Sequence, residues 1–419
     1  MTSVARLQHR IDELGAIART DDPAREIYGT SVSRLGLTPD EQRARDAVAA
    51  WCTPHGAQIR RDAAANLYAR FPGTDADAPV ILVGSHLDSV PMGGRFDGAL
   101  GVCIAVEAVV SLVESGARFA RPVEIVGWAD EEGARFGIGL FGSSAAFRRL
   151  PGYAAGLKDK AGVSITDALR SLDLSGDPFG AAREPTGIRA YLEPHIEQGP
   201  RLERAGLALG VVSDIVGIYH ARVTIEGRAD HAGATVMGAR MDALVAATYA
   251  IQALERIAAS VPDAVGTVGE ISVRPGAKNV VPGECTFSLD IRAPKQESID
   301  RVKDELFDEL RRLMRGPDGR ARSRGWKTES LHEVPVTPLD TGIREILVRS
   351  VREVGVEPLV LISGAGHDAQ NPSLAGVPTG MIFVRSTGGS HTPTEFASTN
   401  DAALGAQALE LAIRELAST

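Results

Sequence analysis

Histidine and carboxylate side chains gather where two apolar segments of the sequence end. His86 and Asp88 lie within four residues of the end of the first segment, 79–84, and Asp97 lies in the glycine-flanked loop just beyond them. The second segment, 122–128, is followed by the acidic run 130–132. Adjacent carboxylates repel one another unless a cation or a raised pKa relieves the repulsion. An acidic surface turn is the alternative interpretation, but the positions of these residues favour a cation site.

Two further histidines lie in segments that could join this group. His195 lies within Glu-Pro-His-Ile-Glu-Gln-Gly at 193–199, and His391 lies within the glycine-rich loop 388–393. Imidazole together with carboxylate suits zinc, manganese, cobalt or nickel. Two ions about 3.5–4 Å apart need a bridging carboxylate and leave room for a shared water whose pKa they lower. Asp97 is the natural bridge, so the sequence predicts a two-metal site.

Two other features of the sequence leave a role open. His231 and the pair His367 and Asp368 lie in loops that resemble those of the other histidines. The segment 137–142 matches the dinucleotide fingerprint G-x-G-x-x-G, which would indicate an oxidoreductase. That fingerprint directly follows a strand in nucleotide-binding folds, whereas here the acidic run 130–132 intervenes. We therefore do not expect the chain to bind a nicotinamide cofactor.

The elements that must position these residues alternate along the chain. Short apolar runs predict buried strands, and amphipathic stretches predict helices. Their order predicts an α/β fold with a mostly parallel sheet, in which ligands bind beyond the carboxyl ends of the strands. The predicted strands are 79–84, 122–128, 358–362 and 380–384, and the predicted helices are 38–51, 101–114 and 401–416.

A different pattern begins near Asp214. Strands that alternate polar and apolar residues are separated by two amphipathic helices, in the order β-α-β-β-α-β of a recognised α+β unit. This unit interrupts the first, so we expect one domain over 1–213 and 335–419 and an inserted domain over 214–334. The predicted strands of the insertion are 219–226, 266–273, 284–292 and 326–334, and the predicted helices are 242–261 and 297–314.

Length and composition limit the class of protein. The 419 residues exceed the roughly 250–300 at which a single core stops growing. Apolar residues make up 44% and charged residues 24%, as in ordinary globular proteins. The net charge of −9 disfavours binding to nucleic acid or anionic lipid. Widely spaced cysteines suit a reducing compartment, and no apolar run is long enough for a membrane span, so we expect a cytoplasmic protein.

Seven segments together carry a resemblance to a known family. In their order and spacing, the chain resembles the dimetal amidohydrolases of the M20 peptidase superfamily, in its hydantoinase/carbamoylase branch. The segments are GSHLDSVPMGGRFDGALGV at 84–102, DEEGARFG at 130–137, HIEQGP at 195–200, ADHAG at 229–233, the run 274–292 that ends in DIR, SGAGHDA at 363–369 and GGSHTP at 388–393.

The resemblance implies a zinc-peptidase-like catalytic domain and an inserted domain that serves as lid and dimerisation surface. Glu131 would be the general base, and Asp88 would orient one of the ligands. Two divalent ions per subunit (Zn²⁺, Mn²⁺, Co²⁺ or Ni²⁺) would be bound. By resemblance, their ligands would be His86, Asp97, Glu132, His195 and His391.

The resemblance also implies how a substrate would be bound. Gln198, Asn279 and Arg292 would hold its carboxylate and neighbouring groups, and His231 would reach the reacting carbonyl from the partner subunit of a homodimer. The guanidinium of Arg292 has the planar fork that binds a carboxylate in a bidentate manner. A small ureido compound that carries a carboxylate is therefore the expected partner.

The predicted reaction is hydrolysis of a ureido C–N bond in an N-carbamoyl-L-amino acid, which gives an amino acid, ammonia and carbon dioxide. Allantoate amidohydrolase and β-ureidopropionase remain as alternatives, because both would use the same metals, glutamate and arginine. A metal-binding scaffold without catalysis is a more distant alternative, since every expected ligand and Glu131 are present.

Overall fold

The described chain folds into two compact units. Unit 1 comprises 1–213 and 338–419, and unit 2 comprises the intervening 214–337. The sequence placed the return to the first unit at 335 rather than 338. The structure is a computed structural model, and it describes residues 2–22, 27–313 and 321–418.

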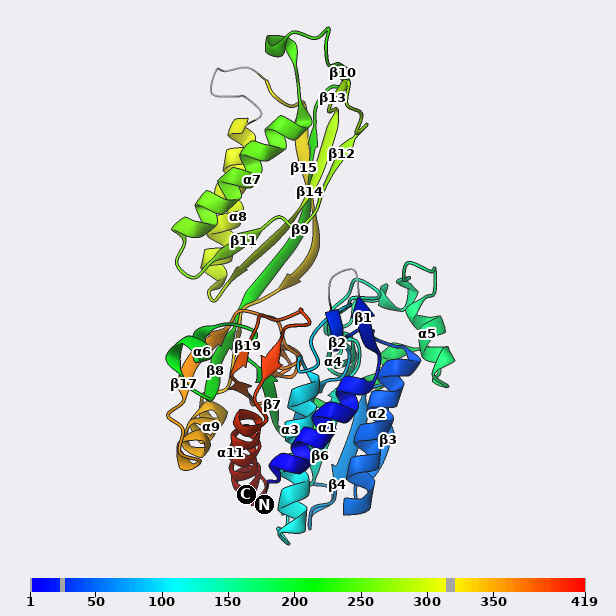
Figure 1. Cartoon of the computed structure of the whole chain (residues 1–419), viewed down its shortest axis with the longest axis vertical. Coiled ribbons are helices and arrows are strands. Elements are labelled where there is room, and N and C mark those ends of the chain that lie inside the picture. Colours follow the sequence, from blue (N-terminus) through cyan, green and yellow to red (C-terminus); the bar gives the residue numbers. More distant parts are fainter. Residues whose placement is uncertain (1, 23–26, 314–320, 419) are drawn as a thin grey trace. The chain divides into compact units, whose positions relative to one another are not determined.

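Unit 1 is built on a nine-stranded sheet in the order β16-β8-β18-β7-β5-β6-β4-β3, with β17 paired to β8 (Figure 1). Its strands are β3 (Gln58–Arg61), β4 (Leu67–Phe71), β5 (Val80–His86), β6 (Val123–Trp128), β7 (Ile188–Ile196), β8 (Leu209–Ile215), β16 (Thr337–Pro338), β17 (Leu359–Ser363) and β18 (Thr379–Val384). Two small hairpins accompany it, β1 (Arg19–Asp22) with β2 (Ile27–Val32) and β19 (Ser386–Thr387) with β20 (Phe396–Ala397).

The helices of unit 1 pack around this sheet. Helices α1, α3 and α11 contact one another and share a large apolar core with the central strands. The helices are α1 (Val4–Ala16), α2 (Pro39–Cys52), α3 (Ala99–Glu114), α4 (Phe141–Ala146), α5 (Ile165–Ser171), α6 (Arg201–Ala205), α9 (Thr341–Glu353), α10 (Gln370–Leu374) and α11 (Thr399–Ser418).

The four central strands, β18, β7, β5 and β6, are mutually parallel. β8 and β4 run antiparallel to their neighbours β18 and β6. The predicted α/β fold with a mostly parallel sheet is therefore confirmed. Because parallel strands end at the same edge of a sheet, the carboxyl ends of these four strands lie side by side.

The amino end of α2 fixes the loop that follows β6. The Thr38 side chain caps the helix by accepting from the Glu41 N–H, and Pro39 occupies the first turn, as such starts favour. The buried Glu41 carboxylate accepts a 3.0 Å hydrogen bond from the N–H of Asp130. It also pairs with the buried Arg45 at 2.9 Å. The helix cap therefore holds the first residue of the acidic run.

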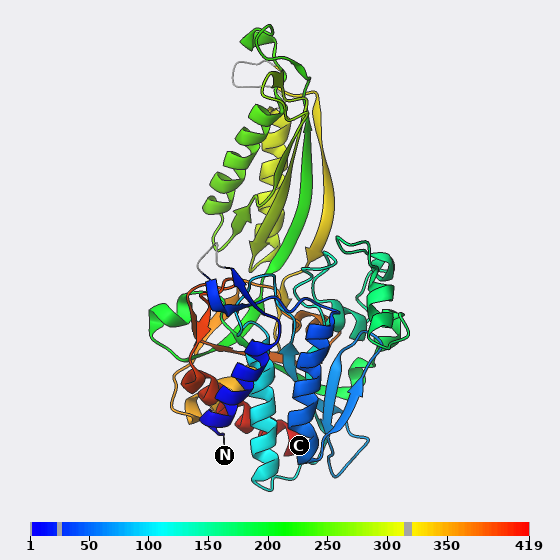
Figure 2. The same ribbon diagram turned by 45° about the vertical axis from the view of Figure 1, so that its right-hand side comes forward.

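Unit 2 is an antiparallel sheet that packs against two helices (Figure 2). The order of its strands is β11-β14-β9-β15, with β12 also paired to β14, and a separate two-stranded sheet joins β10 and β13. The elements are β9 (Gly217–Glu226), β10 (Asp230–His231), α7 (Ala243–Ser260), β11 (Val265–Thr267), β12 (Ile271–Arg274), β13 (Val280–Val281), β14 (Glu284–Ala293), α8 (Gln296–Leu313) and β15 (Gly325–Val334).

The single strand predicted over 266–273 is wrong. The structure divides it into β11 and β12, both of which pair with β14. Between them, the N–H groups of Gly269 and Glu270 donate to the hydroxyl of Ser288, at 3.1 and 3.0 Å. The N–H of Ser288 also donates to the carbonyl of Glu270 at 3.1 Å. The side chain and backbone of one β14 residue therefore bind the segment that separates the two strands.

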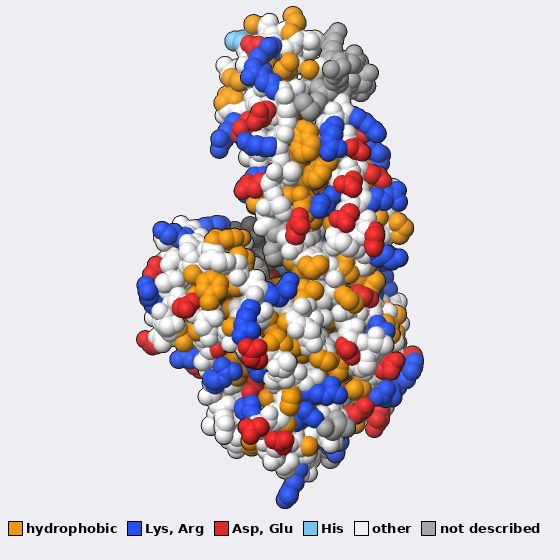
Figure 3. Space-filling model, turned by 180° about the vertical axis from the view of Figure 1, so that it is seen from behind, with side chains coloured by type: hydrophobic (Ala, Val, Ile, Leu, Met, Phe, Trp, Pro, Cys, Tyr) orange, Lys and Arg blue, Asp and Glu red, His pale blue; other side chains and the backbone are white. Residues whose placement is uncertain are grey.

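The helices and surface charges in the described part of the chain bear on binding to membranes and nucleic acids. No helix there is long and apolar enough to cross a bilayer. On the face drawn in Figure 3, the coloured Lys and Arg side chains are interspersed with Asp and Glu. That face therefore carries no extended area of one sign, in keeping with the net charge of −9.

We predict that Gly101→Ala destabilises unit 1 by about 1–3 kcal/mol, because a small-to-large change in a packed core forces backbone shifts. Gly101 lies where α3 crosses β7, and a Cβ there would lie 2.0 Å from the carbonyl oxygen of Pro194. Urea unfolding followed by circular dichroism measures the change. Gly152→Ala is the control, since nothing lies within 4 Å of its Cβ position, and equal stability of both variants would contradict the prediction.

Candidate metal centre and catalytic site

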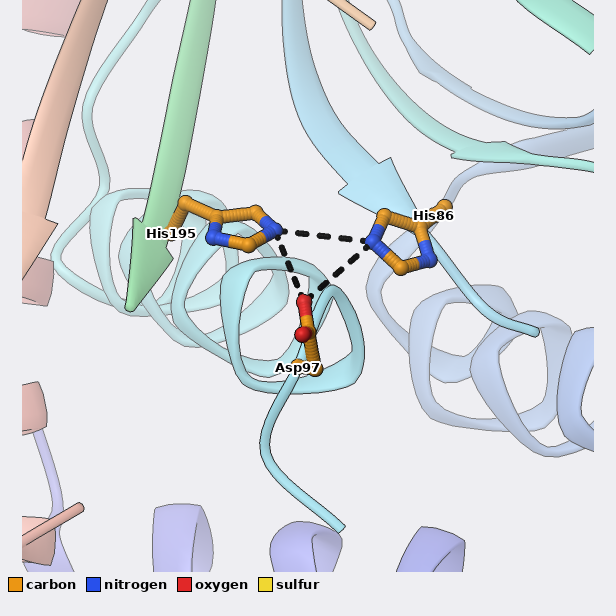
Figure 4. Close-up of side chains that lie close together, drawn as sticks. All are labelled: His86, Asp97 and His195. Carbon is orange, nitrogen blue, oxygen red and sulfur yellow. Dashed lines mark hydrogen bonds and ion pairs between the residues drawn. The ribbon is translucent and has the colours of Figure 1, made fainter. Parts of the chain in front are cut away.

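Asp97 lies between two histidines at the carboxyl ends of neighbouring strands. His86 is the last residue of β5, and His195 lies near the end of β7. Asp97 Oδ1 is 3.6 Å from His86 Nε2 and 3.2 Å from His195 Nε2. The two ring nitrogens are 3.5 Å apart, and all three side chains are buried (Figure 4). This arrangement offers two imidazole nitrogens and one carboxylate oxygen to a single ion.

The second oxygen of Asp97 faces a different pair of residues. Asp97 Oδ2 is 3.4 Å from His391 Nε2, which is itself 3.3 Å from Glu132 Oε2. The hydrogen bond to Asp97 raises the pKa of His391 to about 9, and the charge of Glu132 adds to this. One carboxylate therefore faces a separate ligand group with each of its oxygens, as a bridging ligand does.

The donor set fits divalent cations. Asp97 Oδ1 and Glu132 Oε1 are buried and have no hydrogen-bond partner among the described residues. Buried acceptors without a donor are costly, and a cation satisfies them. Mixed imidazole and carboxylate ligands suit zinc and its neighbours in the transition series. The five residues that form the two groups, called the ligand cluster below, are His86, Asp97, Glu132, His195 and His391.

Asp88 connects His86 to the acidic run. Its carboxylate lies 3.3 Å from His86 Nδ1. The same carboxylate accepts from the N–H groups of Glu131 and Glu132, at 2.9 and 3.1 Å. A carboxylate on the second nitrogen of a ligand histidine fixes its ring orientation and its tautomer. Asp88 thus contacts the ring of His86 and, through the backbone, fixes the position of Glu132.

Glu131 is a buried carboxyl beside the ligand cluster. Its Oε2 lies 3.9 Å from His86 Nε2, and only 11% of its side chain is exposed. Burial raises the pKa of Glu131 well above its ordinary value, His86 opposes the rise, and Glu132 adds to it. A carboxyl whose pKa is raised towards neutrality suits a general base.

Asp97 differs from Glu131 in the sign of its pKa shift. Burial alone would raise the pKa of Asp97, but the facing imidazoles of His195, His391 and His86 hold it well below its usual value. Burial raises the pKa of Glu132 to about 7, and Asp97 adds to the rise. The pKa values of Asp97 and Glu131 are therefore pushed in opposite directions. Such a difference is typical of one carboxylate that stays ionised and one carboxyl that exchanges a proton.

Backbone geometry shows how closely the site is packed. Gln198 and His391 adopt the left-handed conformation, with φ of 61° and 57°. Asp130 does the same, with φ of 49°. Non-glycine residues rarely adopt this conformation, and they cluster at functional sites. Gly98 has φ of 61°, and a Cβ on it would lie 2.3 Å from the His86 ring, so only glycine fits beside that ligand.

The sequence placed His195 in a loop, and this is wrong. His195 lies within β7, where it is the register partner of Phe383 on β18. The proline at 194 and the glycine at 199 favoured a loop, but β7 pairs on both sides with parallel strands. His195 Nδ1 lies 2.9 Å from the carbonyl oxygen of Ile196, which leaves Nε2 directed at Asp97.

Gln198 contacts the ligand cluster. Its Nε2 donates a 2.8 Å hydrogen bond to Asp97 Oδ2. The other three predicted substrate residues belong to unit 2. His231 is exposed in β10, and Asn279 is exposed in the adjacent loop, where its carbonyl accepts from the N–H of Ala232 at 2.9 Å. Arg292 is half-buried on β14.

The guanidinium of Arg292 is bound by a neighbouring carboxylate. Its Nε and Nη2 atoms donate to the two oxygens of Asp290, each at 2.9 Å. His220 Nε2 lies 3.3 Å from the same carboxylate, a contact that the sequence does not predict. His220 on β9 and Asp290 on β14 are cross-strand partners, and only the register of this strand pair brings them together.

Glu395 was missed by the sequence analysis. Its Oε1 accepts from the N–H groups of Phe96 and Asp97, at 3.1 and 3.0 Å. Its Oε2 accepts from Ser390 at 3.1 Å. Burial and the charge of Asp97 raise the pKa of Glu395 to about 7. The available signal was its position two residues after the glycine-rich loop 388–393 that contains His391, from which an acidic residue could reach the site.

A further buried polar layer contacts His195. Glu193 accepts from the hydroxyl of Ser85 at 2.9 Å and from the N–H of Ala369 at 2.7 Å. The ring of His367 lies 4.5 Å from the ring of His195, centroid to centroid. Burial, together with the charge of His195, lowers the pKa of His367 well below its ordinary value. His367, whose role the sequence left open, thus packs against the ring of His195.

Known proteins resemble this chain over its whole length. A model of peptidase family M20/M25/M40 matches residues 82–415. The N-carbamoyl-L-amino acid amidohydrolase of Geobacillus stearothermophilus is 40% identical over 415 residues, which cover 98% of each chain. A probable allantoate deiminase of Oryza sativa subsp. japonica is 34% identical over 94% of this chain and 84% of that protein.

Solved structures agree. The crystal structure of an amidase of the hydantoinase/carbamoylase family from Burkholderia vietnamiensis is 32% identical, with a TM-score of 0.86. It covers 100% of this chain and 98% of that one. The aminopeptidase PepT of Bacillus cereus, at 16% identity and a TM-score of 0.67, shares the fold.

We predict that Gly98→Ala lowers divalent-metal affinity at least tenfold while unit 1 stays folded, because the added Cβ displaces the His86 ring. Losing an orienting contact to a ligand typically costs about 10–100-fold in metal affinity. Equilibrium dialysis with metal analysis measures the change, and Gly156→Ala, with open space around its Cβ position, is the control. Unchanged affinity would remove His86 from the ligand set.

Proposed function

This chain belongs to peptidase family M20/M25/M40, and on that premise we propose that it hydrolyses the ureido C–N bond of an N-carbamoyl-L-amino acid. The family predicted from the sequence is confirmed, and so is the enzyme class, an amidohydrolase of C–N bonds other than peptide bonds. The proposed products are an L-amino acid, ammonia and carbon dioxide, and one water molecule balances the equation.

One observation carries the proposal: the two oxygens of Asp97 face two separate groups of ligands. The family and these groups support the use of divalent metal. We propose two ions per subunit, drawn from Zn²⁺, Mn²⁺, Co²⁺ and Ni²⁺. His86, Asp97 and His195 would hold one, and Asp97, Glu132 and His391 would hold the other.

Glu131 is the proposed proton carrier. The ions, when bound, would supply Lewis acidity to a water molecule and to the ureido carbonyl. Glu131 takes a proton from the attacking water and then delivers it to the leaving nitrogen. Its burial beside the ligand cluster supports this role, because burial makes a carboxylate a stronger base, which can take a proton from water and hold it until the leaving nitrogen accepts it.

The substrate is proposed to be held through its carboxylate and its ureido group. Arg292 would bind the carboxylate, with Gln198 and Asn279 on neighbouring polar groups, and His231 would donate to the carbonyl oxygen. We propose that the protein acts as a homodimer, through the inserted unit, with His231 supplied by the second copy of the chain. Its cytoplasmic location remains a prediction.

A substrate panel tests the function. Metal-stripped protein is refilled with Mn²⁺, Zn²⁺, Co²⁺ or Ni²⁺, and ammonia release is measured with N-carbamoyl-L-amino acids, allantoate, N-carbamoyl-β-alanine and N-acetyl amino acids. We expect metal-dependent turnover to be fastest with an N-carbamoyl-L-amino acid. Faster turnover of allantoate would favour the second candidate, which the rice relative supports, and turnover of N-carbamoyl-β-alanine would indicate a β-ureidopropionase. No turnover with bound metal would favour a scaffold.

We predict that Glu131→Gln binds metal as the parent does and loses at least about 100-fold in kcat, since general acid–base catalysis typically contributes 10²–10⁴-fold. The amide keeps the size of the side chain but cannot accept the proton. Steady-state kinetics and metal analysis of the same preparation measure both effects. A near-parental kcat would exclude Glu131 as the base.

We predict that Arg292→Ala lowers kcat/KM by about 100-fold or more, as expected for a lost charge-assisted hydrogen bond of about 3 kcal/mol. Arg292→Lys keeps the charge without the planar fork, so its kcat/KM should lie between those of the parent and Arg292→Ala. The comparison compound is the carboxamide of the same N-carbamoyl amino acid. If Arg292→Ala slows both compounds equally, Arg292 does not bind the carboxylate.

A further inference from the structure

His231 has one ring nitrogen that is already used within its own loop. Nδ1 accepts hydrogen bonds from the backbone N–H groups of Gly233 and Ala234, each at 3.0 Å. A ring nitrogen that accepts must be unprotonated, and a neutral imidazole then carries its only hydrogen on the other nitrogen. The structure therefore assigns the Nε2–H tautomer to His231.

The loop that provides these amides is closed by an arginine. Arg240 is half-buried, and it donates from Nε to the carbonyl of Thr235 at 3.0 Å and from Nη2 to the carbonyl of Ala232 at 2.5 Å. The N–H of Thr235 in turn donates to the carbonyl of His231 at 3.0 Å. One guanidinium thus binds both sides of the turn that follows the histidine.

Other contacts fix the two ends of this loop. The N–H of His231 donates to its neighbour Asp230 at 2.8 Å. Arg228 Nη2 donates to the carbonyl of Ala239 at 2.9 Å. His231 is nevertheless exposed, so the apolar core of unit 2 does not determine the orientation of its ring. Hydrogen bonds within the loop 228–240 do so instead.

We infer that Arg240 is a positioning residue, which holds the turn so that its amides keep His231 as a neutral hydrogen-bond donor at Nε2. The inference rests on the proposed function, in which His231 contacts the substrate carbonyl. A donor prepared in this way stabilises negative charge that develops on the carbonyl oxygen, and no reorganisation is needed during the reaction. The same tautomer excludes Nε2, the nitrogen that would face the substrate, as a proton acceptor.

The tautomer is measured directly, without reference to activity. Full-length protein loaded with Zn²⁺, which is diamagnetic, is labelled with ¹⁵N-histidine, and long-range ¹H–¹⁵N correlations are recorded above pH 7.5. The His231 signals are identified by their loss in His231→Gln. We expect the pattern of a protonated Nε2 and an unprotonated Nδ1. A protonated Nδ1 would overturn the inference even if the enzyme is active, and the result stands even if no ureido substrate is turned over.

Arg240→Ala tests the positioning role. We expect the His231 signals to shift to a mixture of tautomers, kcat to fall at least tenfold, and KM to change less than about twofold. Arg256→Ala is the matched control, because Arg256 is an exposed arginine on α7 whose ion pair with Glu309 spans 3.8 Å. A parental tautomer pattern and parental kcat in Arg240→Ala would overturn the role of Arg240.

Two substitutions of His231 itself separate a donor from a base. The amide nitrogen of His231→Gln can occupy the position of Nε2 and donate, whereas His231→Asn is too short to reach it. We expect His231→Gln to retain at least tenfold more kcat than His231→Asn. Equal loss in both variants would contradict a donor role, because only a base would be lost equally by both changes.

Discussion

The two oxygens of the Asp97 carboxylate are buried, and each must find positive charge in a place that water does not reach. The structure meets this requirement by directing two imidazoles at one oxygen and a third at the other. Burial alone would favour the neutral acid, yet these groups hold the pKa of Asp97 well below its usual range. The ends of β5 and β7 and the loop that contains His391 supply these three imidazoles.

Backbone amides carry much of the support for the site. Asp88 receives two of them from the acidic run, Glu395 receives two from the loop of Asp97, and Glu41 receives one from Asp130. Each carboxylate thus fixes a loop that bears another carboxylate.

The sequence revealed much of this because side-chain type and strand periodicity are local properties. The end of β6 at 128 could be recognised from an apolar run, whereas β5 continues two residues beyond the predicted end at 84 and includes His86. Parallel strands bring their ends to one edge. The contacts that depend on register could not be recognised. Glu395 reaches Asp97 only after β19 and β20 pair, and Asp290 meets His220 only in the pairing of β14 with β9. The break between β11 and β12 depends on Ser288 in the same way.

Unit 1 is assembled from two stretches of chain separated by the whole of unit 2. β18 and the loop that bears His391 and Glu395 belong to the later stretch, whereas β5, β6 and β7 belong to the earlier one. During synthesis on the ribosome, the first stretch exposes its carboxylates and the unpaired edge of β7 until β18 and the loop that follows it emerge. Contacts of such long sequence separation form slowly, so completion of the metal centre and completion of the sheet coincide late in folding.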